Sequence, residues 1–377
     1  MPSRMVLIGA GRPHLFLLEA LAHRPLVPAA NVTVVAPWPH RPNPALAAGL
    51  VTGEYDAAEI DIDVAALARR AGAVFVEGTA DRLDPAARAV ALTNGRSIPY
   101  DAVSIAIGAG PEYLSVPGLV EHAVVLKPVE RALDVVPALE RAVEAAPLEG
   151  IRVAVVGAGT EGVEMALAIR SRLDRLSGGR GVVTLIEAAH VILPGARPRL
   201  IQEAERVLRR RDITLILGGT AREVAAGVLT LTNGAHLMFD LLVWSTGGGA
   251  PRLYRNSGLP VDRDGYLSLD GHLCCPDVPG VFGAGDTVAI AGFPHSDAGV
   301  VQPERQARVL YENLAAALTG RAPAARYQPG SREPQFVATG EGRAILSWGD
   351  LILSGRWAGR MKDRRERKLM ARWNGRA

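Results

Sequence analysis

The chain has 377 residues, of which 48% are hydrophobic and 21% are charged. This length fits two or three domains, and the composition excludes a disordered chain because it supplies enough apolar surface for a large core. The net charge of +3 is unevenly spread, since residues 356–377 carry nine Arg or Lys against two acidic residues. The other 33 basic and 37 acidic residues leave the body at −4, which argues against a general nucleic-acid binder.

Cys274 and Cys275 are the only cysteines, and they are adjacent in the sequence. Neighbouring residues of a strand point to opposite faces, and the chain has no C-x-x-C or metal-ligand spacing, so we expect neither a disulfide framework nor a metal site. A first strand near Arg4 leaves no room for a signal peptide, and no apolar run reaches the roughly 18–20 residues of a membrane span. We therefore expect a cytoplasmic protein, at most peripheral on the inner face of the membrane.

The N-terminal segment has the pattern of a strand, a glycine turn and a helix. Residues 5–8 are an apolar strand, Gly9 and Gly11 form a G-x-G, and residues 15–21 have helical periodicity. His14 stands where a dinucleotide-binding motif has its third glycine, so the helix would sit slightly further from the strand.

The predicted strand at residues 32–35 ends at Ala36, without the acid that would bind ribose hydroxyls at this first site. A proline-rich loop follows around Arg41, which is a candidate cofactor-binding residue. Next come a predicted helix at 63–70 and a strand at 74–77 of the same sheet.

Two segments of the chain repeat one another. Residues 89–110 align without a gap on residues 228–249, at a constant offset of 139. Each copy predicts a hairpin with an Asn-Gly turn, then an aspartate and a buried strand that ends on a glycine, Gly108 or Gly247. The chain therefore holds two copies of one nucleotide-binding plan, separated by a predicted linker at 117–128 and a helix at 129–145.

A second glycine motif follows the apolar strand at residues 153–156 and precedes helical spacing. It is a G-x-G-x-x-G made by Gly157, Gly159 and Gly162. The glycines would permit the tight turn, the approach of a pyrophosphate to the backbone, and close packing of helix on strand. The next predicted strand, 182–186, leads into Glu187, whose carboxylate can bind both hydroxyls of an adenosine ribose.

After the second copy, a predicted strand at 280–282 runs into a G-A-G-D sequence that contains Gly285 and Asp286, and a helix is predicted at 303–318. Two interpretations of Asp286 remain open. Its carboxylate can accept a hydrogen bond from a polyol hydroxyl, or it can cap a helix.

The C-terminal part predicts short strands at 335–339, 343–348 and 351–353, followed by a basic helix. On that helix four apolar residues fall on one stripe: Trp357, Met361, Leu369 and Trp373. Such a helix either anchors the protein at a membrane surface or docks its stripe on the protein's own body, and the sequence favours neither.

These features together resemble the two-dinucleotide-binding-domain flavoproteins, the pyridine nucleotide-disulfide oxidoreductase superfamily, to about residue 320. The details are most similar to the type II NADH dehydrogenase-like branch, and within it to the oxidoreductase associated with selenophosphate synthetase. The narrower resemblance is carried by the G-x-G-x-x-H start, I-P-Y-D-x-x-S at 98–104, E-H-A-V-V-L-K-P at 121–128, A-G-V at 298–300 and W-x-x-x-x-K-D at 357–363.

The resemblance implies an α/β fold with two Rossmann-like FAD/NAD(P)-binding domains of the glutathione-reductase type and a small C-terminal segment. It implies an FAD-binding domain in two parts, an NAD(P)H-binding domain between them, and a C-terminal segment with a basic amphipathic tail. The expected ranges, in that order, are residues 1–118 with 247–325, residues 119–246, and residues 326–377.

The resemblance also implies roles for individual residues. Around FAD it places the pyrophosphate at Gly9, Gly11 and His14, the adenine at the Ala80 backbone, the ribitol at Asp286, and the flavin pyrimidine near Ala298, Gly299 and Val300. Around NAD(P)H it places the pyrophosphate at Gly157, Gly159 and Gly162, the ribose at Glu187, and Gly247 in the wall. Because Glu187 is followed by two alanines and no arginine, NADH is favoured over NADPH.

One candidate catalytic residue is Glu164, two residues after the third glycine, because relatives carry an acid there near the nicotinamide or flavin edge. The alternative is a first-turn acid that complements the helix dipole. No cysteine occurs at 38–60, so disulfide chemistry is not expected. We expect an FAD-dependent NADH dehydrogenase with a small-molecule acceptor, a quinone being favoured, and a homodimer stays open. The rival is a flavin- or NAD-binding redox-responsive partner protein with little turnover.

Overall fold

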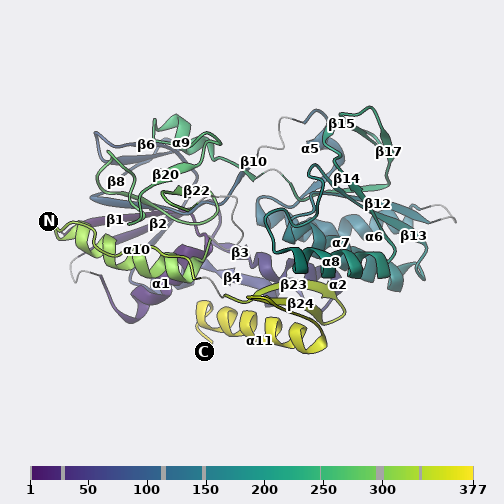
Figure 1. The fold of residues 1–377 in the computed structure, drawn as a ribbon. Helices are drawn as coiled ribbons and strands as arrows, with labels where there is room; N and C mark the ends of the chain where they lie inside the picture. The colour runs from purple at the N-terminus through teal and green to yellow at the C-terminus, as the bar shows by residue number, and fades with distance from the viewer. Residues whose placement is uncertain are drawn as a thin grey trace.

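The computed structural model describes residues 2–26, 30–111, 116–146, 150–246, 248–293, 301–330 and 333–376. Two α/β lobes stand side by side, and the C-terminal segment lies beneath both of them (Figure 1). The predicted fold class is confirmed, because each lobe is built on a parallel five-stranded sheet.

The first lobe contains a sheet in the order β21-β9-β1-β2-β5, with all neighbours parallel. Its strands are β1 (Arg4–Ile8), β2 (Asn31–Ala36), β5 (Val74–Glu77), β9 (Ala102–Ile105) and β21 (Val281–Gly283). Since β21 follows the whole second lobe in the sequence, the chain leaves the first sheet and returns to complete it. The domain boundaries at residues 118, 246 and 325 stay predictions.

The second lobe has the equivalent sheet in the order β11-β18-β12-β13-β14, again parallel throughout. Its strands are β11 (Val124–Val125), β12 (Ile151–Val156), β13 (Gly181–Glu187), β14 (Ile213–Leu217) and β18 (Leu241–Trp244). The segment predicted as a linker at 117–128 thus supplies the edge strand β11, whose two residues are too few to give a period-two signal.

The sequence repeat corresponds to a structural repeat. The sheet of β6 (Ala80–Asp84), β7 (Ala89–Leu92) and β8 (Ser97–Pro99) matches the sheet of β15 (Ala221–Ala225), β16 (Val228–Leu231) and β17 (His236–Met238). The hairpin registers keep the offset of 139, since Val90 pairs with Ile98 as Leu229 pairs with Leu237.

The aspartates after these hairpins also make the same contacts in both lobes. Asp101 accepts from the backbone N–H of Arg4 at 2.7 Å and from its guanidinium at 3.0 Å. Asp240 accepts from the backbone N–H of Arg152 at 2.7 Å and from its guanidinium at 2.6 Å. In each lobe the aspartate ties the end of the hairpin to the start of the central strand.

Helices cover the sheets. In the first lobe α1 (Arg12–His23) and α10 (Pro303–Leu318) lie together below the sheet, and in the second α6 (Val135–Glu144), α7 (Thr160–Leu176) and α8 (Pro198–Arg210) lie below the strands (Figure 1). The remaining elements are β3 (His40–Pro42), η1 (Pro44–Leu46), α2 (Ala47–Thr52), α3 (Ala57–Ile60), β4 (Asp61–Asp63), α4 (Val64–Arg70), β10 (Gly110–Pro111), α5 (Leu119–His122), η3 (Val129–Asp134), β19 (Gly248–Gly249), α9 (Arg252–Asn256), β20 (Leu267–Leu269) and β22 (Val288–Ile290).

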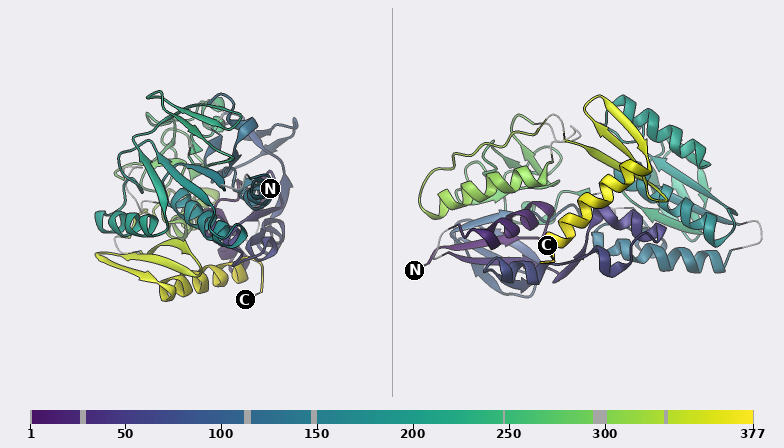
Figure 2. Two further views of the ribbon diagram at one scale, coloured as in Figure 1. Left: turned by 90° about the vertical axis from the view of Figure 1, so that its right-hand side faces the viewer. Right: turned by 90° about the horizontal axis from the view of Figure 1, so that it is seen from below.

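The C-terminal segment forms a three-stranded antiparallel sheet and one helix. The strands β23 (Gln335–Gly340), β24 (Arg343–Trp348) and β25 (Leu351–Gly355) match the predicted ones, and α11 (Arg356–Trp373) packs on β24. Seen from below, the sheet lies against the second lobe while α11 crosses towards the first (Figure 2). The segment therefore bridges the two lobes.

The apolar stripe of α11 divides into two halves. Leu369 and Trp373 are buried, and the Trp373 ring meets Phe16 of α1 edge-on at 5.3 Å between centroids. Trp357 and Met361 remain 41% and 45% exposed. Docking on the body thus accounts for the C-terminal half of the stripe only. Within the described ranges, no helix combines the length and the apolar character needed to cross a membrane.

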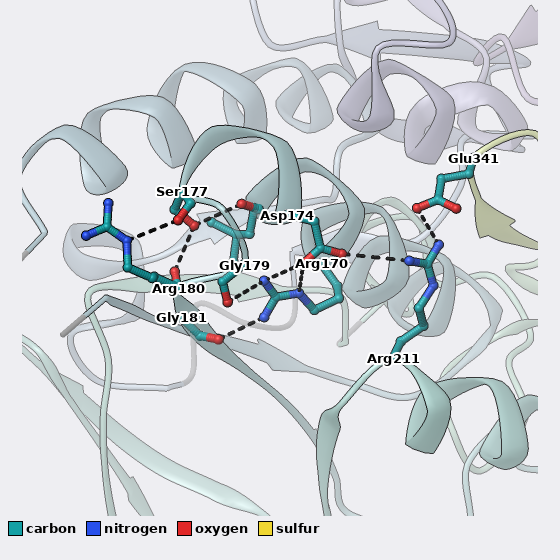
Figure 3. A network of polar contacts seen from close by, with 9 residues as sticks. Arg170, Asp174, Ser177, Gly179, Arg180, Gly181, Arg211 and Glu341 are labelled. Carbon is teal, nitrogen blue, oxygen red and sulfur yellow. Dashed lines mark hydrogen bonds and ion pairs between the residues drawn. The ribbon is translucent and has the colours of Figure 1, made fainter. Parts of the chain in front are cut away.

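A polar network fastens the C-terminal sheet to the second lobe (Figure 3). Arg170 of α7 is 5% exposed, pairs with Asp174 at 2.8 Å, and donates to two carbonyls of the turn at 179–181. Arg211 lies 3.7 Å from Asp174 and 2.7 Å from Glu341, which stands in the turn between β23 and β24. The cooperating charges join α7, the end of α8 and the C-terminal hairpin.

Candidate nucleotide-binding site

A cavity of about 1170 Å³ lies where the two lobes and the C-terminal segment meet. Gly9 of the first glycine turn contributes to one wall, and Thr160 and Glu161 at the start of α7 contribute to another. Lys362 and Glu366 of α11 contribute to a third. Residues far apart in the sequence therefore share one space that is large enough for more than one ligand.

The first glycine turn brings bare backbone to this space. Gly9 has φ +87°, and a Cβ there would lie 2.4 Å from the carbonyl oxygen of Ala106, so only glycine fits. Gly11 precedes α1 and donates its N–H to the same oxygen at 2.8 Å. Gly108, after β9, has φ +70° and open space beside it, and it lines the cavity.

His14 stands behind the turn rather than in the cavity. Its ring is fully buried, with Nδ1 2.7 Å from the carbonyl oxygen of Gly9 and Nε2 2.9 Å from Oγ of Ser104. Burial lowers the pKa of His14 to about 4, which keeps the ring neutral. Because both ring nitrogens are engaged, His14 supports the turn and does not face a ligand.

Two arginines border the cavity near the same turn. Arg41 donates through Nη1 to the carbonyl of Ala10, and Arg12 is the first residue of α1. The Nε atoms of both side chains are buried and have no hydrogen-bond partner among the residues that the structure describes. Buried unpaired guanidinium donors of this kind match the oxygens of a phosphate.

The wall after β2 carries no acid. Ala36, Trp38 and the start of β6 at Ala80 line the cavity there, and Trp38 is 44% exposed. Asp286, which is exposed, also lines the cavity, shortly after β21, and Gly285 before it donates its N–H to Oε1 of Gln306 at 3.0 Å. The aspartate does not cap a described helix, since α10 begins only at Pro303.

The second glycine motif packs β12 closely against α7. A Cβ on Gly162 would lie 1.8 Å from the carbonyl oxygen of Gly157, whereas Gly159 has open space beside it. The first turn of α7 follows directly, and its backbone N–H groups suit an anion. Glu187 ends β13, and its carboxylate accepts from the N–H groups of Ala158 at 2.6 Å and Ala189 at 2.9 Å.

The carboxyl of Glu161 has a raised pKa. Burial raises its pKa to about 7, Lys127 opposes the rise, and the carboxylates of Glu164 and Asp286 add to it. All four side chains line the cavity. Glu161 is therefore close to half-protonated at neutral pH, at the helix end where an anionic ligand would bind.

Glu164 faces the C-terminal segment. It is 7% exposed, accepts from the N–H of Ala338 in β23 at 2.6 Å, and lies 3.7 Å from Nζ of Lys362 in α11. Burial raises the pKa of Glu164, and the ammonium of Lys362 opposes this. These contacts tie the start of α7 to the C-terminal segment beside the cavity, and the role of Glu164 stays a prediction.

The structure brings part of the predicted set together. Six predicted residues line the cavity: Gly9, Arg41, Ala80, Gly108, Glu164 and Asp286. Seven others shape the turns behind it without lining it: Gly11, His14, Gly157, Gly159, Gly162, Glu187 and Gly285. Four lie outside the described residues: Gly247, Ala298, Gly299 and Val300.

The sequence reasoning missed several charged residues of the cavity, namely Arg12, Lys127, Glu161, Lys362 and Glu366. The rarity of lysine could have indicated two of them, because the chain has only three lysines and two of these line the cavity. Arg12 and Glu161 lie inside the glycine motifs, where only the glycines were interpreted.

The cysteines lie elsewhere. Within the described ranges, neither Cys274 nor Cys275 lines the cavity. Burial raises the pKa of the two thiols, to about 12 and about 11, so both are protonated and unreactive at neutral pH.

The fold has two equivalent parallel sheets, each with a glycine turn between its central strand and the next helix, and one cavity where the two lobes meet. These features define an oxidoreductase fold with two dinucleotide-binding domains. The family model for pyridine nucleotide-disulphide oxidoreductases matches residues 4–312. The chain belongs to this family.

Comparison with known proteins narrows the relationship. The chain is 29% identical over 252 residues to the type II NADH:quinone oxidoreductase Ndh of Mycobacterium tuberculosis, an alignment that spans 60% of this chain but only 54% of that protein. The fold superposes on the sulfide:quinone oxidoreductase of Aquifex aeolicus with a TM-score of 0.83 at 19% identity, over 99% of this chain and 92% of that one. It superposes on NDH2 of Plasmodium falciparum, solved with NADH, with a TM-score of 0.79 at 14% identity, over 100% and 96%. The resemblance to type II NADH dehydrogenases is thus confirmed.

Proposed function

We propose that the chain is an FAD-dependent oxidoreductase that takes hydride from NADH and passes the electrons to a small acceptor, with a quinone favoured. The observation that supports this most is the single cavity, whose walls carry the first glycine turn, the start of α7 and the C-terminal segment. Hydride transfer requires the nicotinamide of NADH to face the flavin of FAD, and a cavity shared by both sites permits this arrangement.

The residues at the first turn fit FAD. The unpaired Nε atoms of Arg12 and Arg41 are suited to a pyrophosphate, and the open side of Gly108 leaves room beside the backbone. Asp286 would accept from the ribitol, and the Ala80 backbone would meet the adenine. When bound, the flavin supplies hydride acceptance and electron transfer. The placement of residues 298–300 at the pyrimidine end stays a prediction from the sequence resemblance, because these residues lie outside the described ranges.

The residues at the second motif fit NADH. The first-turn N–H groups of α7 would hold its pyrophosphate, with Gly159 leaving the approach open. Glu187 is positioned by two backbone N–H groups at the end of β13, and it retains lone pairs for ribose hydroxyls. No arginine follows it in Ala188 and Ala189, so NADH is favoured over NADPH.

Glu164 is the proposed catalytic residue on the acceptor side. Burial raises the pKa of its carboxyl and so favours the protonated form, and the Lys362 ammonium 3.7 Å away balances the charge when the proton leaves. Reduction of a quinone requires protons as well as electrons. A buried acid between the cavity and the C-terminal segment is placed to deliver one.

The exposed half of α11 supports a peripheral membrane contact. Trp357 and Met361 are exposed beside Arg356 and Arg360, which combines apolar side chains with cations that attract anionic lipid. Sedimentation with anionic liposomes tests this. A Trp357→Ser/Met361→Ser variant should lose binding, whereas Val182→Ser, at a site 51% exposed on β13 of the second lobe, should not.

The spectrum of the purified protein under anaerobic NADH tests the function. Flavin bands that bleach with NADH, and steady-state NADH oxidation that rises with added quinone, are expected. Oxidation that stays at the slow rate set by oxygen would instead favour a redox-responsive partner protein. A selenium-linked acceptor, which the narrower sequence resemblance implies, is the second candidate and would replace quinone in the same assay.

The proposal is for a non-disulfide enzyme, which a cysteine variant tests. The Cys274→Ser/Cys275→Ser protein should keep the NADH oxidation rate, because both thiols lie away from the cavity and are protonated. A loss of turnover with unchanged flavin content would contradict this part of the proposal.

A further inference from the structure

Arg12 occupies a special place in the first nucleotide site. It opens α1 directly after Gly11, so its backbone lies at the positive end of the helix and its side chain lines the cavity. Its Nε is buried and has no partner among the described residues. A guanidinium at this position points to the phosphates of the proposed dinucleotide.

The side chain of Arg12 is held by the C-terminal helix. Its Nη2 lies 3.5 Å from Oε2 of Glu366, and its guanidinium carbon lies 5.6 Å from the centroid of the Trp373 ring. Glu366 and Trp373 are seven residues apart, two turns of one helix face. An ion pair and a cation–π contact from α11 therefore fix one cation of the first lobe.

Glu366 is itself fixed before any ligand arrives. It is 6% exposed, and its Oε2 accepts from Nδ2 of Asn43 at 3.0 Å. Asn43 is fully buried, and its Oδ1 accepts from the N–H of Ala45 at 3.1 Å. The carboxylate thus has a set position, and it offsets the charge of the half-buried Arg12, which lowers the pKa of Arg41 at the same cavity.

The geometry points to a positioning role for α11 in cofactor binding: Glu366 and Trp373 hold Arg12 in place for the pyrophosphate of the dinucleotide at the first site. This inference rests on the proposed function for the existence of that dinucleotide. An arginine side chain loses much rotamer freedom when it is fixed, and fixing it in the folded protein removes that cost from the binding step.

The test is a double-mutant cycle on FAD affinity with the full chain. Wild type, Arg12→Met, Glu366→Gln and the double variant are stripped of flavin and titrated with FAD by fluorescence quenching. Each single substitution should weaken FAD binding by about tenfold to hundredfold, the range of a charge-assisted hydrogen bond. The double variant should be no weaker than Arg12→Met, because Glu366 acts through Arg12.

Asp363→Asn is the matched control on the same helix. Asp363 bonds to the hydroxyl of Tyr55 at 2.6 Å and pairs with Arg367 at 2.8 Å, and it does not line the cavity. It should keep the wild-type affinity for FAD. Riboflavin, which has no phosphate, should bind wild type and Glu366→Gln alike, and this readout separates phosphate positioning from a general loosening of the fold.

The outcomes distinguish the two proposals. If wild type binds no FAD, the proposed function fails. Two results would overturn the positioning role and leave the proposed function standing. In the first, wild type and Glu366→Gln bind FAD with equal affinity. In the second, the losses of affinity from Arg12→Met and Glu366→Gln add in full in the double variant. Should Glu366→Gln fail to fold, Trp373→Phe, which keeps an aromatic ring against Phe16, should weaken FAD several-fold, and an unchanged affinity would overturn the inference.

Discussion

The titration of Glu161 predicts that NADH binding depends on pH. Glu161 is the second residue of α7, next to the N–H groups proposed to hold the NADH pyrophosphate. Burial first, and then the carboxylates of Glu164 and Asp286, raise its pKa to about 7, while Lys127 opposes the rise. Below that pH the carboxyl is neutral, and above it a negative charge faces an anionic ligand.

The size of the effect follows from the pKa of Glu161. Two like charges about 5 Å apart repel by about 3 kcal/mol at an effective dielectric of about 20, enough to make the protonated form the binding form. Apparent affinity for NADH should then fall about tenfold from pH 6 to pH 8, and about tenfold more by pH 9, as the group deprotonates. NADH itself has no group that titrates in this range.

The assay is a titration of the holoenzyme with tetrahydro-NAD, an analogue that cannot reduce the flavin, across that pH range. Glu161→Gln should bind at all pH values as wild type does at low pH. Lys127→Met should shift the wild-type profile to higher pH, because Lys127 lowers the pKa of Glu161. A wild-type profile as flat as that of Glu161→Gln, or affinity that rises with pH, would refute the reasoning.

Three further outcomes are expected. Gly162→Ala places a Cβ 1.8 Å from the carbonyl oxygen of Gly157, so α7 must shift; titration should show NADH affinity lost with flavin content retained, and equal NADH affinity would contradict the packing argument. Glu164→Gln should slow reoxidation by quinone about 100-fold or more while bleaching by NADH keeps its rate, which stopped-flow absorbance measures for each half-reaction. Arg170→Met removes the ion pair with Asp174 and leaves two turn carbonyls without their donor (Figure 3). It should lower the free energy of unfolding in urea by about 2–4 kcal/mol. The control Arg180→Met, at an exposed site, should change it by about 0.5 kcal/mol or less.

The parts of the fold that were predictable from the sequence depend on local signals. The Asn-Gly turns and the offset of 139 fix the two hairpins, and both occur in the structure with the same register. The two glycine turns and the strands β23 and β24 were predictable for the same reason, because turn chemistry and period-two alternation act over a few residues.

Other features could not be predicted because they depend on contacts between distant segments. The role of His14 depends on Ser104 of β9, which lies 90 residues further along the chain and whose Oγ is 2.9 Å from Nε2 of the ring. The pairing of Glu164 with Lys362 joins residues 198 positions apart, and no periodicity encodes such a contact. The stripe on α11 showed where apolar residues gather, but not that Trp357 stays exposed while Trp373 is buried.

The C-terminal segment has a consequence for the geometry of hydride transfer. Arg211 and Glu341 fasten its hairpin to the second lobe, and Trp373 on Phe16 fastens its helix to the first. Transfer needs reacting atoms about 3–3.5 Å apart, a spacing that two lobes with independent motion could not hold. Since the segment bridges both lobes and also lines the cavity, it can set that spacing and also form a wall of the space proposed for the acceptor. Loosening the hairpin with Glu341→Gln should therefore slow flavin reduction by saturating NADH while FAD affinity is kept, and an unchanged reduction rate would show that the lobes are held by other contacts.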